Sequence, residues 1–180
     1  MGSALTFVGL LVLVAVFGTL AYGALSAAPW VPVPRFDVER LLELARLKPG
    51  EIIYDLGCGD GRLLIKAAQT YDVKAIGFEV SLLPYFLARW HVARSGVGER
   101  VKIHYRNFWS APLGQADVIV TFLTPRAMQR LSLKIPTELK PGARLVSYAF
   151  KLPGCTPTIT SRPRSQDMVI YLYTKIVQMI

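Results

Sequence analysis

The stretch that decides the fold is Tyr54-Asp55-Leu56-Gly57-Cys58-Gly59-Asp60-Gly61, in which three glycines alternate with other residues. It completes a short apolar strand predicted over 51–56 and opens a helix predicted over 62–69. Glycines at such a turn allow positive φ angles and let the backbone approach a ligand closely. The stretch therefore predicts a ligand site at the carboxyl end of a parallel strand.

Two kinds of phosphate-binding loop are excluded by the neighbouring residues. The dinucleotide fingerprint needs Gly or Ala at its sixth position, where counting from Gly57 as the first gives Arg62, and the chain has no Walker A sequence. Asp55 and Asp60 stand where phosphate oxygens would come, so these carboxylates favour a ligand with an ammonium group. Glu79 ends the next predicted strand and can accept both hydroxyls of a ribose. A ligand with a ribose and an ammonium group but no phosphate is S-adenosylmethionine.

Apolar strands and helices alternate on both sides of this loop. The alternation predicts an α/β domain of parallel strands with right-handed crossovers. Ser81 and the pair Thr124-Pro125 are typical of helix starts, and Pro49-Gly50 and Gly96 of helix ends. The remaining strands are predicted over 73–78, 101–105, 117–123, 144–150 and 168–177, and the other helices over 81–95, 124–135 and a segment beginning at Asp37, with an irregular stretch at 151–167.

The motif D-x-G-x-G-x-G, from Asp55 to Gly61, resembles that of the class I S-adenosylmethionine-dependent methyltransferases. The resemblance covers residues 37–177 and implies a Rossmann-like sheet, mostly parallel with a C-terminal antiparallel strand. It implies that the glycine loop surrounds the methionine part of the cofactor and that Glu79 takes the ribose. Asn107 occupies the place of an adenine-binding Asp. The implied cofactor-binding residues are Tyr54, Asp55, Gly57, Cys58, Gly59, Gly61, Glu79, Asn107 and Phe108, with Phe108 and Trp109 open to an alternative role as core aromatics.

A closer resemblance is to the membrane-anchored protein-lysine methyltransferases, which modify the adenine nucleotide translocase and the ATP-synthase c subunit. It rests on Pro29-Trp30-Val31-Pro32, on Asn107-Phe108-Trp109 where the family has D-L-W, and on the stretches 122–125 and 149–153. It implies a membrane-proximal protein substrate. An apolar wall at 122–125 would lower the pKa of the attacking lysine by desolvation. Thr124 and Pro125 are the candidates for positioning its amine, with capping of a helix as the alternative role of Thr124.

The first 28 residues are predicted to form a single transmembrane anchor. Positions 2–34 contain no charged side chain, and all 21 basic and 12 acidic residues follow from Arg35 onward. The run at 4–28 exceeds the ~20 apolar residues that span a bilayer. Basic residues after the span predict that the catalytic domain faces the cytoplasm. A secretory signal cleaved after Ser26-Ala27-Ala28 and a buried core helix are the alternatives.

Residues 29–36 are predicted to be a stiff Pro-rich connector, and 37–180 to be the methyltransferase domain. Trp30 is expected at the membrane interface with its N–H in water. This arrangement would hold the catalytic domain close to the bilayer, which makes the membrane lipid itself a partner.

Composition excludes other classes. Two cysteines and two histidines are too few for a disulfide scaffold or a zinc site, and no metal is expected. The net charge of +9 is dispersed, which favours an anionic membrane surface, and no nucleic-acid partner is expected. Three alternatives stay open: a lipid or quinone methyltransferase, an RNA methyltransferase, and a scaffold without enzymatic activity.

Overall fold

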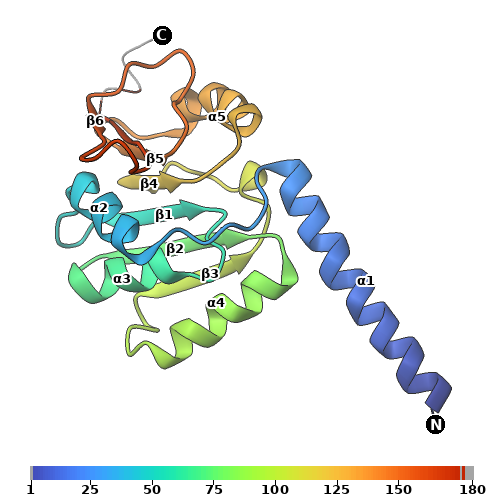
Figure 1. Ribbon diagram of the computed structural model, residues 1–180. Coiled ribbons are helices and arrows are strands. Elements are labelled where there is room, and N and C mark those ends of the chain that lie inside the picture. The colour runs from blue at the N-terminus through green and yellow to red at the C-terminus, as the bar shows by residue number, and fades with distance from the viewer. Residues whose placement is uncertain (1, 175, 177–180) are drawn as a thin grey trace.

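A seven-stranded sheet forms the centre of the computed structural model, which describes residues 2–174 and 176 (Figure 1). The strand order is β3-β2-β1-β4-β5-β7-β6. The first five strands of that order run parallel, whereas β7 is antiparallel to both β5 and β6. The predicted sheet is therefore confirmed. The strands are β1 (Ile52–Leu56), β2 (Lys74–Glu79), β3 (Val101–Tyr105), β4 (Val118–Thr121), β5 (Arg144–Tyr148), β6 (Ile159–Ser161) and β7 (Ile170–Tyr173).

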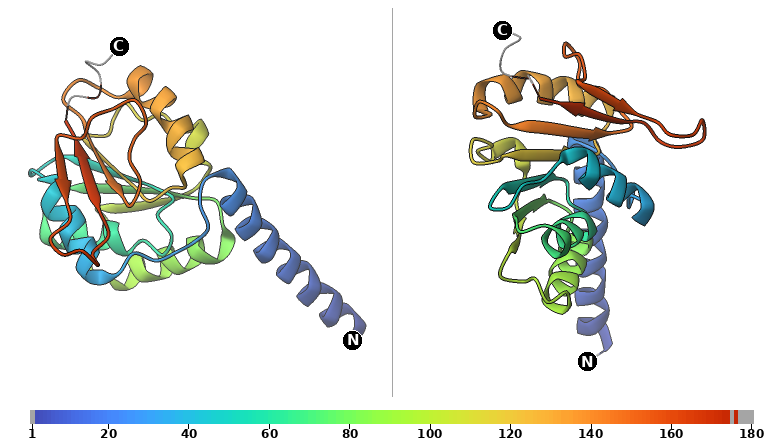
Figure 2. Two further views of the ribbon diagram at one scale, coloured as in Figure 1. Left: turned by 45° about the horizontal axis from the view of Figure 1, so that its top comes forward. Right: turned by 90° about the vertical axis from the view of Figure 1, so that its left-hand side faces the viewer.

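Helices cover both faces of the sheet, as the right-hand view of Figure 2 shows. On one face lie α2 (Arg35–Ala45), α3 (Arg62–Thr70) and α4 (Leu82–Arg94); on the other lie α5 (Pro125–Glu138) and the short 3₁₀ helix η1 (Phe108–Ser110). Two separate apolar clusters fill the space between the sheet and these helices. This three-layer arrangement is the expected consequence of a parallel sheet that is buried on both faces.

Several predicted element ends differ from the observed ones for identifiable reasons. β4 is shorter than the predicted 117–123; Asp117 lies just before it, and its carboxylate accepts the N–H of Ile52 at 2.8 Å. β5 ends at Tyr148 because Ala149 has a left-handed φ of 68°. β7 ends before the predicted position, and the last predicted residue, Val177, lies outside the described residues.

The start of α4 is capped differently from the prediction. Ser81 occupies the N-cap position, but its hydroxyl donates to the carbonyl of Thr19 at 3.3 Å instead of capping its own helix. The Thr19 hydroxyl accepts the Leu82 N–H at 3.1 Å in its place. An orphan amide of α4 is thus satisfied by a residue of the N-terminal helix, a contact that local sequence rules do not encode.

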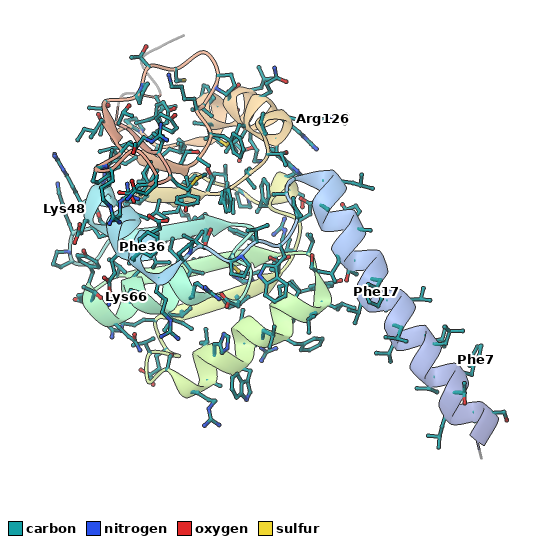
Figure 3. The ribbon with its side chains drawn as sticks, viewed as in Figure 1. Phe7, Phe17, Phe36, Lys48, Lys66 and Arg126 are labelled. Atoms are coloured by element: carbon teal, nitrogen blue, oxygen red, sulfur yellow. The ribbon has the colours of Figure 1, made fainter. Side chains whose placement is uncertain are left out.

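Helix α1 (Gly2–Ser26) projects from the rest of the molecule. It is long and apolar enough to cross a membrane, and Gly23 is the one residue along it that is buried. Figure 3 shows Phe7 and Phe17 standing clear of the other elements, and both side chains are more than 60% exposed. This exposure contradicts the alternative of a buried core helix.

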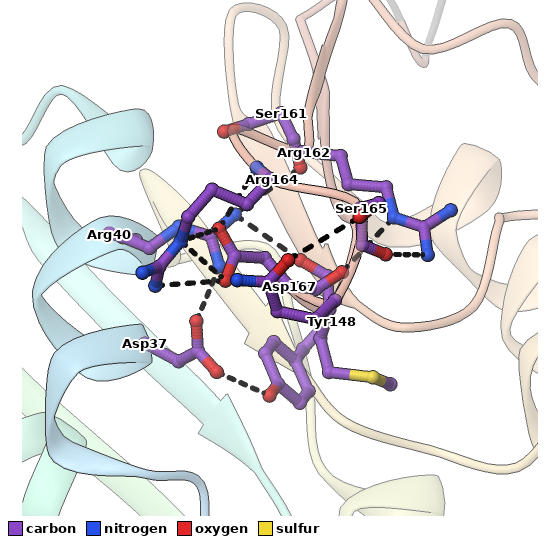
Figure 4. Close-up of polar contacts among 10 residues, drawn as sticks. Asp37, Arg40, Tyr148, Ser161, Arg162, Arg164, Ser165 and Asp167 are labelled. Atoms are coloured by element: carbon purple, nitrogen blue, oxygen red, sulfur yellow. Dashed lines mark hydrogen bonds and ion pairs between the residues drawn. The ribbon is translucent and has the colours of Figure 1, made fainter.

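A polar network fastens α2 to the antiparallel edge of the sheet (Figure 4). The Asp37 carboxylate accepts a hydrogen bond from the Tyr148 hydroxyl at 2.7 Å and pairs with Arg40. Arg40 also donates to the Met168 carbonyl at 3.2 Å, just before β7. In the same close-up, Asp167 pairs with Arg164 at 3.1 Å. Because α2 begins at Arg35, inside the connector predicted over 29–36, this network also fixes where the Pro-rich segment ends.

The glycine at position 77 lets β2 pass the glycine loop. A Cβ built there would lie 2.6 Å from the Cys58 Sγ and 2.6 Å from a Leu64 methyl group. We expect Gly77→Ala to lower the free energy of unfolding by about 1–3 kcal/mol, because these buried side chains must shift. Thermal and denaturant unfolding of the detergent-solubilised chain would measure the loss.

The matched control is Gly98→Ala. The nearest atom to its added methyl group would be a carbonyl oxygen at 3.8 Å, so its effect should stay within about 0.5 kcal/mol. Equal unfolding midpoints for the two variants would contradict the close packing at Gly77.

Candidate cofactor site

A cavity lies at the carboxyl ends of β1, β2 and β4, where the strand order changes direction. Its walls include Asp55, Gly57, Glu79, Asn107 and Leu123. This is the position at which open parallel sheets bind their ligands. The structure therefore brings together the predicted acids, the glycine loop and the end of the third strand around one space.

The glycine loop has the positive φ angles that its composition predicts. The φ angles of Gly57, Gly59 and Gly61 are 86°, 55° and 77°. Residues other than glycine rarely adopt this region of backbone conformation. The amides of Gly57 and Cys58 both donate to the carbonyl of Phe78 at 3.0 Å. The loop is thus tied to the end of β2, the strand that carries Glu79.

Glu79 organises the backbone around the cavity. One carboxylate oxygen accepts the N–H groups of Val80 and Ser81 at 2.8 Å each, and the other accepts the N–H of Gly59 at 2.9 Å. A carboxylate offers about four acceptor positions, so the second oxygen keeps capacity for one further donor. That geometry fits a ribose hydroxyl at this point.

Asp55 is buried in the cavity without a partner. None of the residues that the structure describes donates a hydrogen bond to its carboxylate. Burial, and then the charges of Glu79 and Asp60, raise the pKa of Asp55 to about 7. A buried, unpaired carboxylate beside a second one is a site for a cation, which fits the ammonium and sulfonium groups of S-adenosylmethionine.

Asp60 differs from Asp55. Its carboxylate pairs with the Arg62 guanidinium at 2.6 Å. Burial opposes ionisation here, but the hydrogen bonds and charge of Arg62 hold the pKa of Asp60 below its usual value. Because Arg62 already neutralises it, Asp60 is the weaker candidate for the cofactor ammonium, although the sequence presented the two acids alike.

Cys58 lines the same cavity as a buried thiol. Burial, and then the charges of Asp55 and Glu79, raise its pKa, so the thiol stays protonated at neutral pH. The side chain therefore packs in the wall and is not a nucleophile.

Asn107 and Phe108 line the side of the cavity where adenine is expected. The Asn107 amide oxygen accepts the Trp109 N–H at 3.0 Å and, as a carbonyl oxygen, keeps a second acceptor position. Its amide nitrogen donates to the hydroxyl of Tyr22 at 2.8 Å. Phe108 packs against Trp109 with ring centroids 4.5 Å apart, and Phe108 alone of the two borders the cavity.

Four predicted site residues lie outside the cavity wall. Tyr54 is buried in the core with its ring 5.4 Å from that of Phe78, and Gly61 serves as the N-cap of α3. Thr124 caps α5, accepting the Ala127 N–H at 3.4 Å, and Pro125 is the first residue of that helix. Capping, the alternative role of Thr124, is therefore present in the structure.

Trp30 is one cavity residue that the sequence did not assign to the cofactor site. Its ring covers the glycine loop, so that a Cβ on Gly59 would lie 2.9 Å from the indole nitrogen. That nitrogen is buried and has no hydrogen-bond partner among the described residues. The expectation of a solvated Trp30 N–H at the membrane interface is therefore wrong. In the sequence, the feature that marks Trp30 is its place between two prolines. Its position over the glycine loop depends on the tertiary fold.

The connector forms part of the wall instead of a free spacer. Residues 29–33 border the cavity, and the Val33 carbonyl accepts a hydrogen bond from Arg62 at 3.0 Å. The end of α1 closes the adjoining side: the Ala27 carbonyl accepts the Thr124 hydroxyl at 2.6 Å, and the Ser26 carbonyl accepts the Trp109 indole N–H at 3.1 Å. The apolar helix and the candidate cofactor site are thus one continuous structure.

Residues 55–159 match the family model for the ANTKMT methyltransferase domain. A protein-lysine N-methyltransferase from Saccharolobus islandicus is 37% identical over 81% of this chain and 92% of its own length. The chain belongs to the ANTKMT methyltransferase family. It is therefore a methyltransferase, and S-adenosylmethionine is its methyl donor.

Two further proteins that resemble this chain are named for different substrates. The adenine nucleotide translocase lysine N-methyltransferase of Mus musculus is 37% identical over 72% of this chain, but the match spans only 56% of the mouse protein. An RNA methyltransferase from Salinibacter ruber, solved with S-adenosyl-L-homocysteine, is 31% identical over 80% of this chain and 93% of its own, with a TM-score of 0.76. The fold is therefore shared by methyltransferases whose named substrates differ.

The raised pKa of Asp55 predicts that cofactor binding depends on pH. The folded chain holds this proton more tightly than the unfolded chain, so without ligand the free energy of unfolding falls as pH rises from 3.8 to about 7. A cationic cofactor binds the ionised form, so its affinity should rise roughly tenfold between about pH 5.5 and about pH 7.

Isothermal titration of S-adenosylmethionine into the wild-type chain and into Asp55→Asn would test this prediction. The variant should bind more weakly and lose most of the pH dependence, because its amide does not titrate. A wild-type affinity that stays constant over this pH range would contradict the assignment of Asp55.

Proposed function

We propose that this protein transfers a methyl group from S-adenosylmethionine to a lysine amine of a protein at the membrane surface. The observation that carries the proposal is the 37% identity to a named protein-lysine N-methyltransferase, matched over 92% of that protein's length. The match therefore extends beyond the cofactor motif to the elements that border the reacting end of the cavity.

Bound S-adenosylmethionine supplies an activated methyl group, and the chain must bring a neutral amine in line with it. Phe122 and Leu123 border the cavity at the end of β4. The Phe122 ring lies edge-on to Tyr148, with centroids 4.8 Å apart. This apolar wall lowers the pKa of an entering lysine by desolvation and excludes water from the transfer.

Tyr148 is not a general base in this scheme. Its hydroxyl already donates to Asp37, and burial, followed by the hydrogen bond and charge of Asp37, raises its pKa well above the usual range. The hydroxyl therefore stays protonated at neutral pH. The proton of the lysine is lost to water on entry, driven by desolvation.

Thr124 and Pro125 act as positioning residues. The Thr124 hydroxyl donates to Ala27 and its N–H donates to the same carbonyl at 3.2 Å. Pro125 begins α5 immediately after that contact. Together they hold the segment that carries Phe122 and Leu123 in place beside the reacting amine.

Helix α1 serves as a single-pass membrane anchor in this proposal. Its side chains from Gly2 to Ala15 are exposed, and its end is bonded to the catalytic domain at Ser26 and Ala27. This bonding supports retention of the helix over cleavage as a secretory signal. Arg35, Arg40 and other basic residues after the helix support a cytoplasmic catalytic domain.

One observation favours a second function, methylation of RNA. The Salinibacter ruber neighbour is named an RNA methyltransferase and shares 31% identity with this chain. A lipid or quinone substrate is the third candidate, because a membrane anchor suits it equally. The three substrate classes differ in how the transferred methyl group is recovered.

Methylation of membranes from a strain lacking the gene distinguishes these classes. The full chain is incubated with such membranes and methyl-labelled S-adenosylmethionine. We expect label that survives nuclease and solvent extraction and appears as N-methylated lysine after acid hydrolysis.

The control is Asp55→Asn, which should reduce incorporation at least roughly tenfold because the cofactor binds weakly. Label released by ribonuclease would establish the RNA alternative, and label extracted into organic solvent would establish the lipid or quinone alternative. Either result would contradict the lysine proposal.

A further inference from the structure

The exposed face of α4 is unusual for a helix on the surface of a folded domain. Leu83, Phe86 and Trp90 are 41%, 61% and 56% exposed, and their spacing of three and four residues places them on one side of the helix. The opposite side packs into the domain through Pro84 and Ala88, which are buried. The helix is thus apolar on both faces, a pattern typical of helices that do not face water.

Basic side chains frame this face. Arg94 lies over the Trp90 ring with its guanidinium carbon 5.1 Å from the ring centre, and Arg89 lies 5.9 Å from the centre of Tyr85. The helix carries no acidic residue. An apolar stripe with aromatic and arginine side chains matches the boundary between acyl chains and anionic headgroups.

The position of α1 indicates where a bilayer would lie. Thr19 of α1 is hydrogen-bonded to Ser81 and Leu82 at the start of α4. Gly23 packs so closely that an added Cβ would lie 2.7 Å from the Ser81 hydroxyl. A bilayer can surround α1 only up to the point where the folded domain begins, so its surface must lie near Thr19.

From this junction α4 runs away from α1 at a steep angle, in Figure 1 and in the left-hand view of Figure 2 alike. A helix that crosses the axis of a transmembrane segment at the bilayer surface lies along that surface. The apolar face of α4 then lies beside the exposed apolar surface of α1, which includes Phe17.

We infer that the α4 face formed by Leu83, Phe86, Trp90, Arg89 and Arg94 is a second membrane contact, which lies in the interface of an anionic bilayer beside α1. The inference rests on the proposed anchoring of α1. The contact holds the catalytic domain in a fixed orientation against the bilayer, so that its cavity reaches substrates at the membrane surface.

Spin labels on the full chain in vesicles of phosphatidylcholine and phosphatidylglycerol test this inference. Cys155 is replaced by Ser, and the buried, protonated Cys58 is left in place as an unreactive thiol. Single cysteines then carry the label in Phe86→Cys on α4, Val12→Cys on α1 and Leu133→Cys on α5. Leu133 is 77% exposed and serves as the matched solvent control.

We expect the label at position 86 to collide several-fold less with a water-soluble nickel chelate than the label at 133, and more with oxygen. The protection should weaken in vesicles of phosphatidylcholine alone, because Arg89 and Arg94 lose their anionic partners. The label at position 12 reports on the anchor independently.

Each outcome decides one point. Protection at 12 with full chelate access at 86 would overturn the α4 contact and leave the anchor intact. Chelate access at 12 would overturn the anchor on which the inference rests. Spin–spin broadening at 86 would show that a second copy of the chain covers this face, which also overturns the inference.

Discussion

The arrangement of the cofactor site depends on two carboxylates that line the same cavity. The Asp55 carboxylate has no hydrogen-bond partner among the described residues. The Glu79 carboxylate accepts three backbone N–H groups beside the glycine loop. Leaving a carboxylate unpaired in such a place costs free energy unless a ligand brings positive charge. The cavity is therefore arranged for a cationic nucleoside, and the glycine backbone follows from the need to approach it.

The same cavity is closed by segments that precede the catalytic domain in the chain. The Trp30 ring covers Gly59, and the end of α1 is bonded to Thr124 and Trp109. Exclusion of water is a requirement of methyl transfer to a desolvated amine. Helix α1 and the connector therefore form part of the cavity wall, and a displaced α1 would open it.

Much of the fold could be predicted from local sequence signals. The glycine motif, the alternation of strands and helices, and the position of Glu79 depend on residues close together in the chain, and the structure confirms their arrangement. The features that the sequence did not predict depend on contacts between distant segments. The Trp30 ring packs over Gly59, Asn107 donates a hydrogen bond to Tyr22, and Thr19 caps α4. Helix and strand propensities and hydrophobic periodicity do not predict contacts of this kind.

The most direct test of the central claim compares two ligands on the full chain by isothermal titration. S-Adenosylmethionine carries the ammonium group, whereas methylthioadenosine keeps the ribose and adenine but lacks the amino-acid part. Asp55→Asn should lower the affinity for S-adenosylmethionine roughly tenfold or more and change the affinity for methylthioadenosine by no more than about twofold. Glu79→Gln should lower the affinity for both ligands. Equal losses for the two ligands in Asp55→Asn, or undiminished binding of S-adenosylmethionine, would contradict the assignment of this carboxylate to the cofactor's positive charge.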